Sequence, residues 1–99
     1  MDEVDLGAFK NSQWASCASD EIARQDVVLN REYNALRSSL SPEQRVALTK
    51  AQKAWLAYRE GWCRFDEAGP SAPGGIAGYY FCMLELNDVQ IDALESMQP

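Results

Sequence analysis

Cysteine and carboxylate side chains are the residues through which this chain could do chemistry. The chain has 99 residues, with three cysteines and no histidine. Without histidine, neither a Ser-His nor a Cys-His catalytic arrangement can form. A zinc site would need cysteines and carboxylates alone, and no CxxC pair is present. The sequence therefore predicts no metal site and leaves disulfide formation as the chemistry to consider for the cysteines.

Cys17, Cys63 and Cys82 can pair in three ways, and each pairing leaves one thiol over. We favour Cys63–Cys82, because the Gly/Pro-rich segment 69–75 lies between them and can turn the chain back. Such a bridge closes a loop of about 20 residues and is worth roughly 3 kcal/mol in the chain-entropy model. Three buried, reduced cysteines are the alternative. With Cys17 unpaired, we expect either a monomer or a dimer linked through Cys17.

Carboxylates could act as a general acid and base, for instance Asp66 with Glu67 or with Glu60. Nothing in the sequence marks a cleft around them or a partner that would shift a pKa. The chain also lacks GxGxxG, P-loop and HExxH motifs. We therefore predict a protein that is not an enzyme and that uses no cofactor.

Negative charge is concentrated in the last third of the chain, whose formal net charge is −6. Residues 1–64 contain nine acids and nine bases, whereas residues 65–99 contain six acids and no lysine or arginine. Nucleic acids and anionic membrane surfaces require a basic footprint, so neither is the expected partner. No segment is long and apolar enough for membrane insertion. The charge favours a cationic protein as partner.

Four of these acids recur at steps of three, four and three, which places them on one side of a helix. They are Glu85, Asp88, Asp92 and Glu95, which we call the acidic ridge. A solvated helix face and a docking surface for a basic protein are both compatible with this pattern. The complete absence of intermixed bases counts in favour of docking.

Helical periodicity positions these residues, and no strand pattern of comparable length occurs. We expect a loose, flexible leader at 1–11 and a single helical domain at 12–99. Three helices are predicted, at about 16–40, 42–67 and 78–97. The predicted fold class is all-α, an antiparallel helical hairpin with a third helix packed against it and stapled by a disulfide.

Apolar residues at helical spacing predict the buried face of each helix, and a capping box formed by Ser41 and Gln44 predicts where the second helix begins. The stripe of the first helix is Ile22, Leu29, Tyr33, Leu36 and Leu40. The stripe of the second, with Trp55 and Trp62 expected in the core, is Leu48, Ala51, Trp55, Tyr58, Trp62 and Phe65. The stripe of the third is Tyr79, Cys82, Leu86, Val89, Ala93 and Met97.

Polar residues interrupt these stripes. Asp26 lies within the first stripe, whereas Gln52 and Arg59 share one face of the second helix. We predict a buried or half-buried Asp26–Arg59 pair across the hairpin, which would fix helix register more than it would add stability. A ligand-binding role for Asp26, Gln52 and Arg59 is the alternative.

Residues 51–63, AQKAWLAYREGWC, resemble the AQxxWxxYRxxxC signature of LprI-like lysozyme inhibitors, which are small exported helical domains of bacteria. Residues 26–33 resemble the upstream DxxLNxxY motif of the same family. Gly74 and Gly75 precede a cysteine as in the family's loop, and residues 86–94 resemble its terminal helix. The resemblance covers nearly all of residues 13–96.

Two positions depart from the family pattern. Members commonly carry a cysteine upstream of the position of Cys17, and this chain has none there. Members also usually have an arginine where Gln90 stands. The second departure removes a base from the segment that is acidic here.

The resemblance implies a periplasmic or secreted protein whose signal peptide has been removed, since residues 1–9 lack the signal pattern. It implies the Cys63–Cys82 disulfide and, as in some members, inhibition of host lysozyme. Because host lysozymes are generally cationic, we expect the acidic ridge to dock one. A protein-interaction or toxin-neutralising module of the bacterial envelope is the first alternative. A cell-wall-acting enzyme is the second.

Overall fold

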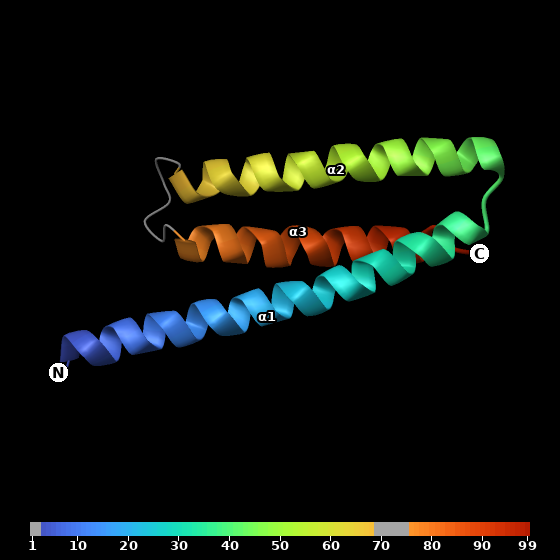
Figure 1. Ribbon diagram of the computed structural model, residues 1–99. Helices are drawn as coiled ribbons and strands as arrows, with labels where there is room; N and C mark the ends of the chain where they lie inside the picture. The colour runs from blue at the N-terminus through green and yellow to red at the C-terminus, as the bar shows by residue number, and fades with distance from the viewer. Residues whose placement is uncertain (1–2, 69–75) are drawn as a thin grey trace.

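Three helices make up the described part of the chain, which is residues 3–68 and 76–99, with the side chains of 16–67 and 78–99. In this computed structural model they are α1 (Glu3–Ser38), α2 (Pro42–Ala68) and α3 (Ile76–Ser96). α1 and α2 run antiparallel, and α3 runs parallel to α1 (Figure 1). The molecule measures 60 × 26 × 16 Å, and its long dimension comes from α1, which extends past the other helices.

α3 is the helix that holds the other two together. It packs along both α1 and α2, whereas α1 and α2 contact each other directly at few positions. In Figure 1, α3 accordingly runs between the other two ribbons. The predicted fold class is confirmed. The two helices of the hairpin are held together mainly through their contacts with the third helix.

α1 begins much earlier than the apolar pattern indicated. It is helical from Glu3, so the expected start near residue 16 is wrong, and most of the predicted leader is part of the helix. No proline occurs before residue 42, so the sequence contains no strong stop signal in this segment. The division into a leader and a domain remains a prediction, and the predicted loop at 69–75 lies outside the described residues.

The turn between α1 and α2 is closed by the predicted capping box. The Gln44 backbone N–H donates to Ser41 Oγ at 3.3 Å, and the Ser41 N–H donates to Gln44 Oε1 at 2.9 Å. Pro42 takes the first helical position, where a missing N–H leaves no hydrogen bond broken. Arg45 Nε donates to the Arg37 carbonyl at 3.0 Å, and the same carbonyl accepts from the Leu40 N–H at 3.2 Å, so two donors satisfy it at the end of α1.

An apolar cluster packs the helices together near this turn. Its buried members are Leu29 and Leu36 of α1 and Leu94 of α3. Partly buried side chains surround them: Tyr33, Leu40, Leu48, Trp55 and Ile91. The part of the predicted α1 stripe from Leu29 to Leu40 is therefore confirmed as its inward face, and Ile22 is not part of the cluster.

The aromatic residues of α2 do not follow the prediction. Tyr58, Trp62 and Phe65 were expected to pack inward, yet they are 52%, 48% and 56% exposed. Trp55 is the aromatic side chain of α2 that does pack against the core cluster. The expectation of a buried Trp62 is therefore wrong.

The reason is that polar and sulfur-containing side chains take the inward positions of α2. Gln52 and Cys63 are buried, and the side chain of Arg59 is mostly covered. Residues 58, 62 and 65 are consequently turned onto the flank of the helix.

α3 departs from its predicted stripe in the same way. Asn87, Met83 and Leu94 point inward, whereas Val89 and Met97 are exposed.

The Cys63–Cys82 disulfide is present and joins the last part of α2 to the first part of α3. The two Cα atoms are 5.5 Å apart, within the ordinary range for a disulfide. The predicted pairing is confirmed. Cys17 is free and exposed on α1.

Candidate functional site

The acidic ridge lies on the outer face of α3. All four of its side chains are exposed. Within the part of the chain that the structure describes, Glu85, Asp92 and Glu95 make no side-chain hydrogen bond or ion pair. Three carboxylates are therefore available to a partner without breaking an internal contact.

Asp88 differs from the rest of the ridge because it also serves the fold. Its Oδ1 accepts a hydrogen bond from Gln25 Nε2 of α1 at 2.9 Å. The same Gln25 nitrogen donates to the Leu84 carbonyl at 3.0 Å. Asp88 thus ties the ridge to α1, and a substitution there would disturb packing as well as surface charge.

A second exposed feature lies on α2, where Tyr58, Trp62 and Phe65 form what we call the aromatic ridge. The rings of Tyr58 and Trp62 are stacked with their centroids 6.2 Å apart and their planes within 10°. The rings of Trp62 and Phe65 are tilted, with centroids 5.6 Å apart. The ridge was not predicted as a surface feature, because its spacing is also that of a core stripe.

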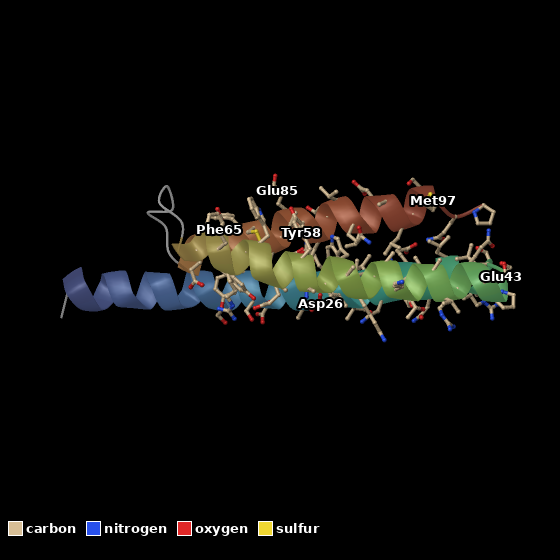
Figure 2. All side chains as sticks on the ribbon, turned by 90° about the horizontal axis from the view of Figure 1, so that it is seen from above. Asp26, Glu43, Tyr58, Phe65, Glu85 and Met97 are labelled. Carbon is tan, nitrogen blue, oxygen red and sulfur yellow. A yellow bond between two sulfur atoms is a disulfide. The ribbon has the colours of Figure 1, made fainter. Side chains whose placement is uncertain are left out.

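The labelled members of the two ridges lie on the same side of the molecule (Figure 2). Figure 2 shows Tyr58 and Phe65 on the edge of α2 next to α3, with Glu85 projecting beyond them from α3. Asp26 lies on the opposite edge in the same view. The disulfide connects the two helices that carry the ridges, so their spacing is covalently fixed at one end.

A buried polar network links the three helices behind this face. Asn87, which is 0% exposed, donates through Nδ2 to Gln25 Oε1 at 3.0 Å. Asn87 Oδ1 accepts from Arg59 Nη1 at 2.9 Å. The same Arg59 nitrogen lies 3.4 Å from Asp26 Oδ1, and its guanidinium lies over the Trp55 ring at 5.2 Å. Asn87 therefore joins one residue of α1 to one residue of α2.

The predicted Asp26–Arg59 contact is thus present, with Arg59 mostly covered and Asp26 about half exposed. Its role in helix register remains a prediction. Sequence reasoning missed Asn87 and Gln25, although both are more buried than either member of the pair. A usable signal was Asn87 itself, a polar residue at helical spacing from Met83 and Leu94.

A groove of about 400 Å³ separates α1 from α2 on the opposite side. Its lining includes all three residues of the predicted ligand alternative, Asp26, Gln52 and Arg59. Lys53 and Asn30 add a cation and an amide. All three polar residues are already engaged within the protein, since Gln52 accepts from Gln90 at 2.9 Å, Arg59 bonds Asn87, and Asp26 lies 3.4 Å from Arg59. The groove is therefore a weaker candidate site than the face with the two ridges.

Glu60 does not have the properties of a general acid. Its carboxylate accepts from Arg64 Nε at 2.8 Å and from the Tyr79 hydroxyl at 3.0 Å. The hydrogen bond from Arg64 lowers the pKa of Glu60 below its ordinary value, despite opposing desolvation. Burial, together with the hydrogen bond to Glu60, raises the pKa of Tyr79. The cluster holds an ionised carboxylate against a neutral phenol and links α2 to α3.

No group of three or more potential metal ligands occurs among the described residues. None of the helices, over the same residues, has the length and apolar character needed to cross a bilayer.

Comparison with known protein families gives a match over most of the chain. Residues 8–94 match the model of a protein family described as lysozyme inhibitor LprI. Neither a curated protein nor a solved structure was found to match the chain. The matched residues include most of all three helices, the whole aromatic ridge and the acidic ridge except Glu95.

Proposed function

The chain belongs to the LprI family of lysozyme inhibitors, and from this premise we propose that it is an exported protein that inhibits lysozyme by docking the enzyme through its acidic ridge. The family match supports the inhibitory role, and the charge pattern supports the choice of surface. The proposed location is the periplasm or the exterior of the bacterium. The proposed activity is binding and occlusion, with no catalysis by this chain.

The observation that carries the proposal is the unpaired negative charge of α3. Glu85, Asp92 and Glu95 are exposed, and no lysine or arginine follows residue 64 in the sequence. Elsewhere the described acids are commonly paired, as Glu21 is with Arg24 and Glu60 with Arg64. A cationic lysozyme would therefore meet a surface whose charge is not already neutralised.

Electrostatic attraction would act mainly on the encounter between the two proteins. Complementary charge raises the association rate and orients the partners, and salt screens it over about 10 Å at 0.1 M ionic strength. Once docked, an elongated helical body over the lysozyme cleft would block access to peptidoglycan. Inhibition by this route is expected to weaken as salt is added.

The test is lysis of a peptidoglycan suspension by an animal-type lysozyme, with and without this protein, at low and physiological salt. The informative variant is Glu85→Lys with Asp92→Lys, because Asp88 also bonds Gln25 and is best left intact. Each reversal changes the charge by two, so the net charge rises from −6 to −2. We expect at least tenfold weaker inhibition at low salt.

The matched control is Asp20→Lys with Glu43→Lys, two exposed acids outside both ridges. This control has the same net charge as the ridge variant, so it separates local from overall charge. Equal loss of inhibition in both variants would contradict a role for the ridge. Lysis caused by this protein without lysozyme would instead support the enzyme alternative. Absence of inhibition in the unaltered protein would contradict the proposed function.

A further inference from the structure

The aromatic ridge is a large apolar surface for a domain of this size. Its three side chains are each about half exposed, while Gln25, Gln52 and Asn87 are buried. An aromatic side chain offers about 150–250 Å² of surface, so the exposed part of the ridge amounts to roughly 300 Å². The largest apolar patch on a typical monomer is about 300–600 Å² and is often functional, so the ridge is a candidate interaction site.

The ridge is also held rigidly. Tyr58 and Trp62 stack on one another, and Phe65 leans against Trp62. Cys63, the neighbour of Trp62 in the chain, is fully buried and bonded to Cys82. Residues that are ordered before binding lose little conformational entropy when a partner arrives. The arrangement therefore suits an anchor for a partner better than a surface that must reorganise.

We propose that the aromatic ridge is the apolar anchor of the lysozyme-docking face and that the acidic ridge is its charged rim. This inference rests on the proposed function and names further residues of the same surface. Tyr and Trp side chains dominate binding energy at protein interfaces when they lie at the centre of the contact. Their ring faces also attract lysine and arginine side chains, which a cationic partner supplies.

Charge favours lysozyme over a second copy of this chain as the occupant. A symmetric dimer through this face would bring two acidic ridges together, and each chain carries a net charge of −6. Like charges placed opposite each other across an interface cost binding energy. A cationic partner places opposite charges there, with the aromatic ridge covered at the centre.

The two ridges make different contributions, which allows them to be tested separately. The acidic ridge acts over a distance and sets the association rate, so its effect fades with salt. The aromatic ridge acts only in contact and slows dissociation, so its effect persists at high salt.

The experiment measures association and dissociation rates of an animal-type lysozyme on the immobilised full-length protein, at 20 mM and at 300 mM salt, roughly the range over which screening changes most. Trp62→Ala and Tyr58→Ala are each expected to raise the dissociation rate at least tenfold at both salt concentrations. Glu85→Lys with Asp92→Lys is expected to lower the association rate at low salt only. Trp62→Phe, which keeps an aromatic ring, is expected to retain most of the affinity.

The matched control is Val46→Ala, which removes an apolar side chain that is 70% exposed on the same helix but lies outside the ridge. It is expected to bind as the unaltered protein does. A far-ultraviolet circular dichroism spectrum and an intact disulfide check folding. If Trp62→Ala fails to fold, Tyr58→Ala and Trp62→Phe carry the test, since Tyr58 is more than half exposed.

Lysozyme binding that is unchanged in the folded Trp62 and Tyr58 variants would overturn the inference and leave the proposed function standing. Absence of lysozyme binding by the unaltered protein would overturn both. A concentration-dependent dimer in sedimentation that Trp62→Ala abolishes would assign the ridge to self-association and overturn the inference as well.

Discussion

α1 and α2 pack on the same helix with different balances of apolar contact and covalent linkage. α1 turns Leu29 and Leu36 toward α3, together with one buried polar residue, Gln25, which bonds Asn87 and Asp88. α2 turns Gln52, Arg59 and Cys63 toward α3 and leaves three aromatic residues outside. Hydrogen bonds join both pairs of helices. The first pair also has the buried leucine cluster, whereas α2 adds only partly buried apolar side chains to that cluster and relies on the disulfide as well.

This difference has a consequence for function. A helix that is attached by directional bonds does not need its largest apolar side chains for packing, so they can serve a partner instead. Tyr58, Trp62 and Phe65 are in that position on α2. If α1 instead exposed its large apolar side chains, Leu29 and Leu36 would leave the buried cluster, and the main apolar core would be lost.

Removal of the disulfide is expected to have the largest effect on the attachment of α2. Replacing both Cys63 and Cys82 by Ser should lower the free energy of unfolding by about 3 kcal/mol, because the bridge closes a loop of about 20 residues in the unfolded chain. Urea denaturation followed by circular dichroism measures this loss. Cys17→Ser is the control and should change little, since that thiol is exposed and unbridged. Equal stability of the double variant and the unaltered protein would show that α2 does not depend on the bridge.

Asn87→Ala is expected to have the next largest effect, a loss of about 2 kcal/mol. Asn87 is fully buried and bonded to both Gln25 and Arg59. Its removal leaves Gln25 Oε1 without its donor and Arg59 Nη1 with only the 3.4 Å contact to Asp26. Asn34→Ala removes an exposed asparagine of α1 and should cost less than about 0.5 kcal/mol. Similar costs for the two variants would contradict a structural role for the polar network.

The same contrast explains which parts of the fold were predictable. On α1, Leu29 and Leu36 recur at helical spacing and are buried, so apolar periodicity identified the inward face. The capping box at Ser41 was predictable because it depends on neighbouring residues alone. On α2, apolar periodicity selected Tyr58 and Trp62, since a rule that assigns apolar residues to the core cannot identify a polar inward face.

The acidic ridge was predictable as a helix face, because four carboxylates without bases between them are rarely buried. The contact of Asp88 with Gln25 was not, since the two residues are 63 positions apart in the sequence. The Asp26–Arg59 contact was proposed because an acid in an apolar stripe needs a partner. The stronger partner of Arg59, Asn87, came from the third helix, whose rotation no local pattern determined.

Substitutions of Arg59 and Asp26 separate the contributions of these two residues to the stability of the polar network. Arg59→Gln should cost about 1–2 kcal/mol, because it removes a hydrogen bond to buried Asn87 and the contact with the Trp55 ring. Asp26→Asn should cost less than about 1 kcal/mol, because Asp26 is half exposed and its contact with Arg59 is 3.4 Å long. Thermal melts of both single variants and the double variant measure the coupling. Unchanged melting temperatures in both single variants would contradict the predicted role of the Asp26–Arg59 pair in fixing helix register.

The smallest expected effect is on the pH dependence of the free energy of unfolding. This dependence should differ between the contacts of α2 with α3 and the contacts of α1 with α3. The Arg64 hydrogen bond lowers the pKa of Glu60, which also accepts from Tyr79 of α3. In the contact between α1 and the C-terminal end of the chain, a hydrogen bond from Gln98 lowers the pKa of Glu32 of α1.

A carboxyl group whose folded-state pKa is lowered contributes stability that is present above its unfolded pKa, about 4.3 for Glu, and lost as the pH falls through the folded pKa. Glu60→Gln and Glu32→Gln should each make stability less dependent on pH below that value, as measured by urea denaturation between pH 7 and pH 3, roughly the range over which Glu titrates. Because Glu60 bonds both α2 and α3, reduction of the disulfide should enlarge the effect of Glu60→Gln and leave that of Glu32→Gln unchanged. Equal responses of the two variants to reduction would contradict the separation of the two attachments.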